Sequence, residues 1–287
     1  MSRNKGDIGH FNKLWKARTR KRKSWFYRGN PTNQIEYAFG QHFDFLKSVV
    51  PVKKSFKCLE VGAGRGSFSA FFADFGCNVT LADLSPDIVK EAELIFKDLG
   101  LSKKAQFCVC DALDLKFPDQ SFDFTTSIGL LEHFEDPSDV IKEQLRVLKP
   151  GGIFTAHVVP AKWHMTKLFE PINDVLRKWE GSVFKGESGY RQKEPLFRTS
   201  YDSAHYKKIM QKLGLKRIGS AGVYPYPAIS YSPEFPFSLM PDDFEKALVE
   251  VFQGMERLRR KENKNKHPWT CDEAIAKEFF IWGVKQG

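Results

Sequence analysis

The sequence CLEVGAGRGSFSAFF, residues 58–72, constrains the fold more than any other stretch of the chain. An apolar run typical of a buried strand leads directly into Gly62, Gly64 and Gly66, and a helical pattern begins at Ser67. Glycines at such a junction let the backbone turn sharply and approach a ligand closely, while the start of the helix presents unpaired N–H groups. The stretch therefore predicts a strand–loop–helix unit of an open α/β sheet, with a ligand crevice at the carboxyl end of the strand.

Strand and helix patterns alternate on both sides of this stretch. Helices are predicted over 35–50, 67–75, 86–99, 139–148, 201–213 and 244–258, and strands over 56–61, 78–82, 106–110, 122–127, 153–159, 215–219 and 278–285. This alternation predicts an α/β fold in which a mostly parallel sheet is covered by helices on both faces. We expect a basic arm over residues 1–34 and one domain over 35–287, with lid insertions at about 160–200 and 223–276.

The positive charge is concentrated in the arm. Residues 1–28 hold five Arg, five Lys and one Asp, so they carry +9 of the net +10, and the remaining 259 residues net only +1. A basic arm suits nucleic acid, an anionic membrane surface or an acidic substrate, and it can equally be a solvated tail. Because the body is nearly neutral, a nucleic-acid substrate is not favoured. We expect the apolar face at Phe11, Leu14 and Trp15 to dock over the mouth of the predicted ligand crevice.

Cysteine usage and hydropathy indicate the compartment in which the protein is expected. The chain has five cysteines and no Cys-x-x-Cys pair, which favours reduced thiols over a disulfide framework or a zinc site, so no metal is predicted. No apolar run approaches the roughly 18 residues of a membrane-spanning helix, and the basic N-terminus lacks the apolar core of a signal peptide. We therefore expect a cytoplasmic protein.

Acidic residues follow the next two predicted strands. Asp83 ends the second strand, 21 residues after Gly62, and Asp111 ends the third. A carboxylate at the first of these positions suits ribose hydroxyls, and dehydrogenases use it as well. Ser67 stands where the dinucleotide-binding pattern requires its third glycine or alanine, so the glycine loop alone does not identify the ligand.

Five motifs together are more specific. They are LEVGAGRG (59–66), LADLS (81–85), CDALDL (110–115), SFDF…LEHF (121–134) and LKPGG (148–152). In these motifs the chain resembles the class I S-adenosylmethionine-dependent methyltransferases of the small-molecule and quinone-methylating branch. The resemblance covers roughly residues 35–160 and resumes at 201–213 and in the last two strands. It implies a Rossmann-like, seven-stranded sheet whose last strand, 278–285, runs antiparallel, and it implies S-adenosyl-L-methionine as the cofactor.

The resemblance also implies roles for the residues of the glycine loop. The methionine part of the cofactor would be wrapped by Gly62, Ala63, Gly64 and Gly66. The acidic residue before the glycines, Glu60, would order this loop. As alternatives, the glycines could serve a tight turn, and each of the three acids, Glu60, Asp83 and Asp111, could be a helix cap or a surface charge.

Further cofactor contacts are implied at the ends of the second, third and fourth strands. Asp83 would bind the ribose hydroxyls, and Leu84 would pack on the adenine. Asp111 would accept a hydrogen bond from the adenine amino group, beside the backbone of Ala112. Ser127 would line the methionine side.

The chemistry that the resemblance implies asks little of side chains, because the methyl group is already activated on a sulfonium. The protein has to align the acceptor and exclude water. A hydroxyl or acidic-carbon acceptor also needs a base, and His133 in LEHF is the predicted base because its loop would border the methyl group. A packing role is the alternative for His133, and His157 and His164 are further candidates for the base.

The acceptor is expected to be a small aromatic or lipophilic molecule. Aromatic residues of the two insertions could enclose it, or could serve ordinary packing; they are Trp163, Tyr190, Tyr224, Tyr226 and Tyr231. The alternative function is a methyltransferase or binding protein that acts on RNA or protein through the basic arm, and a third is a cofactor-binding fold without catalysis. The acceptor atom and the oligomeric state stay open.

Overall fold

The computed structural model describes residues 24–183, 197–223, 240–262 and 266–287. Several sequence predictions lie outside these ranges: the apolar face of the arm and the lid tyrosines Tyr190, Tyr224, Tyr226 and Tyr231. In the described part of the chain, no helix is both long enough and apolar enough to cross a membrane.

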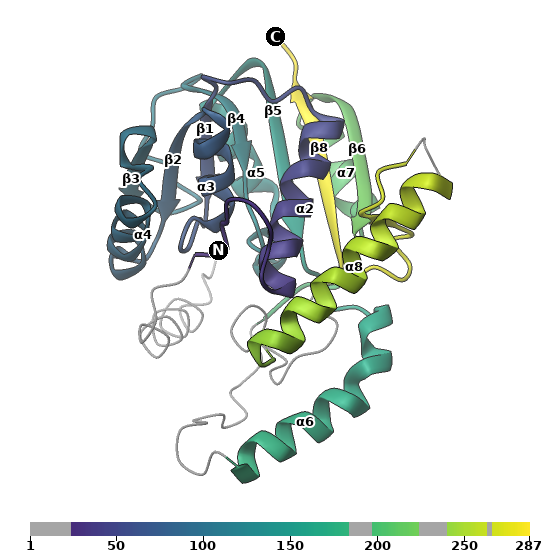
Figure 1. Cartoon of the computed structure of the whole chain (residues 1–287). Helices are drawn as coiled ribbons and strands as arrows, with labels where there is room; N and C mark the ends of the chain where they lie inside the picture. Colours follow the sequence, from purple (N-terminus) through teal and green to yellow (C-terminus); the bar gives the residue numbers. More distant parts are fainter. Residues whose placement is uncertain (1–23, 184–196, 224–239, 263–265) are drawn as a thin grey trace.

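A single twisted sheet lies at the centre of the molecule (Figure 1), and its strand order is β3-β2-β1-β4-β5-β8-β6-β7. The strands are β1 (Lys57–Val61), β2 (Asn78–Asp83), β3 (Ala105–Val109), β4 (Phe122–Thr126), β5 (Leu148–Val158), β6 (Leu215–Val223), β7 (Thr270–Cys271) and β8 (Glu278–Lys285). The five strands from β3 to β5 pair in parallel, and β8 lies antiparallel between β5 and β6. The predicted α/β class and the antiparallel last strand are confirmed.

Two details of the sheet differ from the sequence prediction. The sheet has eight strands among the described residues and not seven, because β7 pairs with the end of β6. β5 begins at Leu148, five residues earlier than predicted, since the Pro-Gly-Gly turn is absorbed as an irregularity in the pairing with β4. Gly151 adopts a φ of 74° there, a conformation that glycine accepts at low cost.

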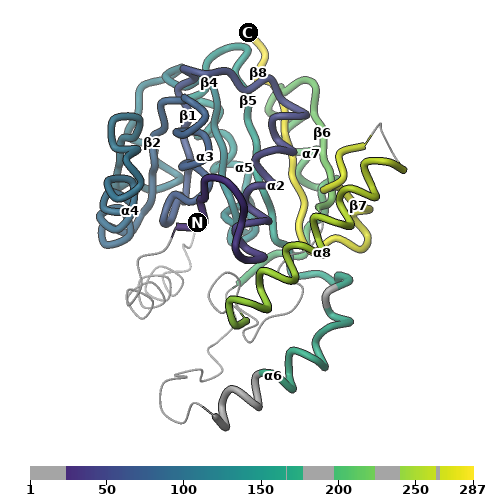
Figure 2. Tube along the Cα trace, in the orientation of Figure 1, coloured from purple at the N-terminus to yellow at the C-terminus, as the bar shows by residue number. Residues whose placement is uncertain are grey.

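Helices cover both faces of the sheet, as predicted. They are α2 (Gln34–Val49), α3 (Ser67–Phe75), α4 (Pro86–Asp98), α5 (Ser138–Val147), α6 (Glu170–Val183), α7 (Ser203–Lys212) and α8 (Asp242–Glu262), with short 3₁₀ turns η1 (Ser102–Lys104), η2 (Leu131–His133) and η3 (Met165–Phe169). In Figure 1, α2 and α3 lie in front of the sheet, and α5 and α7 lie behind it. The tube in Figure 2 shows α6, which belongs to the predicted insertion, standing apart from the sheet.

The front face of the sheet carries an aromatic core. Phe43 of α2 and Phe72 of α3 pack edge to face, with ring centroids 5.0 Å apart, and Phe72 also packs on Phe124 of β4. Asn33 caps α2 by accepting from the first backbone N–H groups of the helix. The sequence pattern of α2 therefore produces a helix whose apolar stripe fastens it to the sheet.

The segment before α2 joins the same core. Trp25 and Phe26 are buried, and Phe26 packs edge to face on Phe71 of α3. The backbone N–H of Trp25 donates to Oγ of Ser67, the first residue of α3, over 3.0 Å. The chain that leaves the basic arm is therefore fastened next to the glycine loop.

Candidate functional site

The candidate site lies where the parallel strands end. The backbone N–H groups of Gly62 and Ala63 donate to the carbonyl of Ala82 in β2, over 2.8 and 3.1 Å. Gly62, Gly64 and Gly66 all have positive φ, between 54° and 69°. Because side chains disfavour this conformation, the loop needs glycines to turn from β1 into α3.

Gly66 and Gly62 are each constrained by different neighbouring side chains. A Cβ on Gly66 would lie 2.2 Å from Cδ2 of Leu81 and 2.8 Å from Cε2 of Phe96. A Cβ on Gly62 would lie 3.0 Å from Cδ1 of Leu130, in the loop after β4. Gly66 therefore serves close helix–sheet packing, and Gly62 brings the loops after β1 and β4 against each other.

Glu60 is buried beneath the glycine loop and faces α3. The backbone N–H of Ser69 donates to its carboxylate over 2.9 Å, and the hydroxyl of Ser69 donates to the same oxygen. Burial raises the pKa of Glu60 to about 7, and the hydrogen bonds from Ser69 oppose this rise. The side chain fastens the start of α3 to β1, so any effect it has on a ligand is exerted through the shape of the loop.

Asp83 links the loops after β1 and β2. Its Oδ2 accepts from the backbone N–H of Gly64 over 2.9 Å, and its Oδ1 accepts from that of Ser85 over 3.0 Å. Desolvation raises the pKa of the Asp83 carboxyl, and these backbone donors oppose the rise. Each oxygen has lone pairs left for hydroxyl donors, so the geometry suits a ligand with vicinal hydroxyls.

The predicted adenine contacts lie beside Asp83. Leu84 exposes its apolar side chain, and Ala112 is half-buried. The backbone N–H of Cys110 donates to the carbonyl of Asp83, and Oδ1 of Asp111 accepts from the N–H of Leu113 over 2.9 Å. The structure thus brings the predicted cofactor residues of β2 and β3 to one edge of the sheet.

Ser127 follows β4 and is fully buried. Its Oγ has no hydrogen-bond partner within the described ranges. Its carbonyl accepts from the backbone N–H of His157 over 2.9 Å, and the N–H of Gly129 donates back to the carbonyl of His157. A buried hydroxyl with no protein partner at a sheet edge fits a position that a polar ligand completes.

His133 ends η2, in the loop after β4. Its Nδ1 lies 2.7 Å from the backbone carbonyl of Phe197. Because a carbonyl only accepts, Nδ1 carries the proton and Nε2 holds the lone pair in the neutral ring. A lone pair on Nε2 suits a base. The hydrogen bond of Nδ1 also fastens the chain at residue 197 to η2, which is a packing role. The predicted role of His133 as a base therefore stays a prediction. His164 is half-buried, and burial lowers its pKa to about 4.

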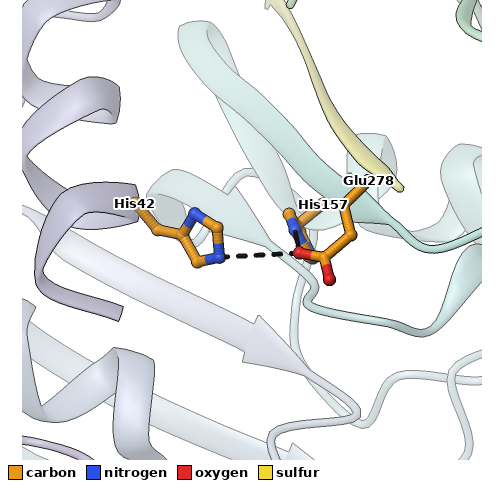
Figure 3. Close-up of side chains that lie close together, drawn as sticks. All are labelled: His42, His157 and Glu278. Carbon is orange, nitrogen blue, oxygen red and sulfur yellow. Dashed lines mark ion pairs between the residues drawn. The ribbon is translucent and has the colours of Figure 1, made fainter. Parts of the chain in front are cut away.

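A second polar group, which the sequence did not reveal as a set, lies between α2, β5 and β8 (Figure 3). Its members are His42, His157 and Glu278, each only 2% exposed. Oε2 of Glu278 is 2.9 Å from Nε2 of His157 and 3.8 Å from Nε2 of His42. Burial alone would raise the pKa of Glu278, but the close contact with His157 and the positive charge of Lys277 outweigh it and leave that pKa at about 2. The carboxyl group is therefore ionised inside the core.

These three residues could in principle hold a metal ion, since their ligand atoms lie within 4.8 Å of one another. The tautomer of His42 argues against it. The indole N–H of Trp269 donates to Nδ1 of His42 over 2.9 Å, so the proton of the neutral ring sits on Nε2, the atom that faces Glu278. Burial lowers the pKa of His42 well below its usual value, which keeps the ring neutral. A protonated Nε2 has no lone pair for a metal.

A parallel sheet with a glycine loop, an acidic residue after β2 and helices on both faces defines a Rossmann-like, ligand-binding α/β domain. Residues 59–156 match the family described as "Methyltransferase domain". These residues, about a third of the chain, therefore form a methyltransferase domain, and the five motifs resemble those of the class I S-adenosylmethionine-dependent methyltransferases.

Curated relatives are similar over this domain. A sterol 24-C-methyltransferase of Aspergillus fumigatus is 32% identical over 53% of this chain and 39% of its own length. A 2-methyl-6-phytyl-1,4-hydroquinone methyltransferase of Synechocystis is 37% identical over 47% of this chain and 43% of its own length. The chain thus spans about two fifths of the length of these relatives.

Solved structures extend the likeness in fold beyond the matched domain. Phosphoethanolamine N-methyltransferase 2 of Haemonchus contortus, in complex with S-adenosyl-L-methionine, superposes with a TM-score of 0.51 at 18% identity. The match covers 86% of this chain and 53% of that one. At this identity the likeness shows the fold alone.

Proposed function

We propose that the protein transfers the methyl group of S-adenosyl-L-methionine to a small lipophilic acceptor. The observation that carries this proposal is the contact between Asp83 and the backbone of Gly64, because it joins the ribose-type carboxylate to the glycine loop within the matched domain. The names of the relatives, which include a sterol and a hydroquinone methyltransferase, support the acceptor class.

The residues present fit the cofactor. The two carboxylate oxygens of Asp83 would accept hydrogen bonds from the ribose hydroxyls. The exposed side chain of Leu84 would cover the adenine. Asp111 would accept a hydrogen bond from the adenine amino group, beside the backbone of Ala112. The glycine loop and the unpartnered hydroxyl of Ser127 would face the methionine part. When bound, the cofactor supplies a methyl group on a positively charged sulfur, so the chain has only to orient the acceptor and exclude water.

The insertion after β5 supports a lipophilic acceptor. Apolar side chains of residues 163–175 are exposed, between 49% and 68%; they are Trp163, Leu168, Ile172 and Val175. An exposed apolar surface of this kind marks contact with an apolar ligand, a membrane surface or another part of the chain. Such a surface suits either of two arrangements: a lid that covers a lipophilic acceptor, or contact with an anionic membrane surface that holds the acceptor.

RNA or protein is the alternative acceptor. It would use the basic arm, whose first 28 residues hold nine of the ten net charges and whose residues 1–23 lie outside the described ranges. Binding of RNA through the arm would weaken steeply with salt, because neutralised phosphates release counterions. The rest of the chain nets only +1, so we favour the small acceptor.

The test is methyl transfer from cofactor labelled in the methyl group, with the full chain and a defined panel of acceptors. The panel holds a sterol, a prenylated hydroquinone, an aromatic amine and total RNA. We expect labelled product in the organic extract from at least one apolar acceptor. Label in RNA, with salt-sensitive binding that is lost on removal of the arm, would contradict the proposed acceptor class.

A further inference from the structure

The helix α8 carries an apolar stripe along its exposed side. The stripe residues follow one another at spacings of four, three, four and three positions and are Phe244, Leu248, Val251, Met255 and Leu258. Leu248 is half-buried, and the other four are between 44% and 60% exposed. This spacing is the one that forms the seam of a coiled coil, so the stripe has the pattern on which a second helix packs.

The opposite side of α8 is fastened to the rest of the protein. Val249 and Phe252 are buried, and the ring of Phe252 packs on that of Tyr37 in α2. The carboxylate of Glu245 is buried and accepts from the backbone N–H and the side-chain amide of Gln34, over 2.8 and 2.9 Å. Figure 1 shows α8 at the periphery of the molecule, where it crosses α2. The helix is therefore held in place by one side while most of its stripe stays exposed.

The exposed charges beside the stripe change sign along the helix. Asp243 and Glu250 are exposed on one flank in the first half of α8. Arg257 and Lys261 are exposed on the same flank in the second half. Asp243 and Lys261 also suit the helix dipole, but Glu250 and Arg257 lie more than a turn inside the helix, so the dipole does not account for them. The flank is thus acidic in one half and basic in the other.

A second copy of α8 fits this pattern when it runs antiparallel. Val251 is the midpoint of the stripe, with Phe244 seven residues before it and Leu258 seven residues after it. A two-fold axis at Val251 brings Phe244 of each copy next to Leu258 of the other. It also brings Asp243 of each copy towards Lys261 of the other, because the two lie on the same flank at similar distances from the axis. A parallel copy would instead set like charges side by side.

We propose that the protein forms a homodimer in which the α8 helices of two copies pack antiparallel through this stripe. Two small residues, Ala247 and Gly254, lie between the stripe and the charged flank, and small side chains allow two helices to approach closely. The contact between two 21-residue helices is small, so the dimer should be weak and its share should rise with protein concentration. The inference uses only the surface of α8 and does not depend on the proposed methyl transfer.

The first experiment is sedimentation velocity of the full chain over about 1–200 µM protein. The sedimentation coefficient of the wild type should rise with concentration towards that of a dimer. Val251→Glu should weaken self-association by about 10²-fold or more, because it places two carboxylates next to each other at the axis. Leu168→Glu is the matched control, because Leu168 is also an exposed apolar residue but belongs to η3. It should leave self-association unchanged.

The second experiment tests the antiparallel order by exchanging charges. Asp243→Lys and Lys261→Asp should each weaken self-association by about three- to tenfold, because each sets like charges against each other at two places in the dimer. The double variant should associate as the wild type does, since every contact again joins opposite charges. In a parallel dimer the single variants would have no such effect, because residue 243 would face residue 243. Circular dichroism of each variant checks that α8 stays helical.

Each result supports the proposal or overturns it. A wild type that stays monomeric at about 200 µM would overturn it, as would loss of self-association in Leu168→Glu but not in Val251→Glu. Binding of the monomer to phosphatidylglycerol vesicles, lost in Val251→Glu, would assign the stripe to a membrane surface instead. A monomeric wild type that Val251→Glu destabilises in urea unfolding would assign the stripe to another segment of the same chain. If Val251→Glu does not fold, the wild-type concentration series and the charge variants still decide.

Discussion

The cofactor edge and the His42–His157–Glu278 cluster are built in opposite ways. At the cofactor edge, the carboxylate of Asp83 contacts the backbone of Gly64, only 19 positions away. In the cluster, Glu278 contacts residues 121 and 236 positions distant, from β5 and α2. The first region is therefore specified by local sequence, and the second exists only once the sheet and α2 have assembled. Four predictions, from the largest expected effect to the smallest, test whether the cofactor edge works as this comparison implies.

Gly66→Ala should destabilise the fold most. The substitution combines a positive φ with a Cβ placed 2.2 Å from Leu81, which together cost about 2–5 kcal/mol. Gly100→Ala is the matched control, because Gly100 also has a positive φ but has no atom within 4 Å of its Cβ position. It should cost about 1–2 kcal/mol. If urea unfolding gives both variants the same loss in free energy of unfolding, the close packing around Gly66 does not contribute to the cost of the substitution.

Glu60→Gln should remove a pH dependence of stability. Burial raises the pKa of Glu60 from 4.5 to about 7, so the fold favours the protonated form. This stabilisation is fully present below pH 4.5 and is lost as the pH rises through about 7. A shift of this size corresponds to about 3 kcal/mol. The free energy of unfolding in urea should be measured for both proteins from pH 4 to pH 8. The wild type should lose stability relative to Glu60→Gln as the pH rises. If the two free energies change with pH in parallel, the predicted pH dependence is refuted.

Asp83→Ala should weaken S-adenosylmethionine binding by about 1.5–3 kcal/mol, or about 10–150-fold, because the ribose hydroxyls lose a charged acceptor. Asp98→Ala serves as the control, since Asp98 is an exposed acid at the end of α4. Calorimetry on the two variants measures the difference directly. If both variants bind as tightly as the wild type, Asp83 has no contact with the cofactor.

Removal of residues 1–23 should change cofactor affinity by no more than about twofold, because the charges removed lie before the segment fastened to α3. Turnover of the acceptor should fall if the arm docks over the site. A deletion through residue 28 is not equivalent, because it takes Trp25 and Phe26 out of the core and removes the hydrogen bond to Ser67. Loss of cofactor affinity in the shorter deletion would show that the arm belongs to the cofactor site.

The contrast explains what the sequence could predict. Helical periodicity and β-type runs fixed the main helices and seven of the strands, because each pattern is long enough to repeat. β7 spans only two residues and exists through its pairing with β6, so it has no pattern of its own. The placement of Asp83 beside the glycine loop followed from parallel strands ending at one edge.

The cluster was missed for the opposite reason. His157 was a candidate, but His42 and Glu278 were not, since no local motif joins them. A signal for His42 was present, because it stands four residues after Ala38 and three after Phe39, on the buried stripe of α2. A titratable side chain on an apolar stripe demands a buried partner, and only the assembled sheet shows that the partner is Glu278.

The most direct test of the central claim, that the local edge is a cofactor site, is calorimetric titration of the full wild-type chain. The account predicts that S-adenosyl-L-methionine binds at one molecule per chain, that S-adenosylhomocysteine competes with it, and that NAD does not bind. Tight binding of NAD with no binding of S-adenosyl-L-methionine would contradict it.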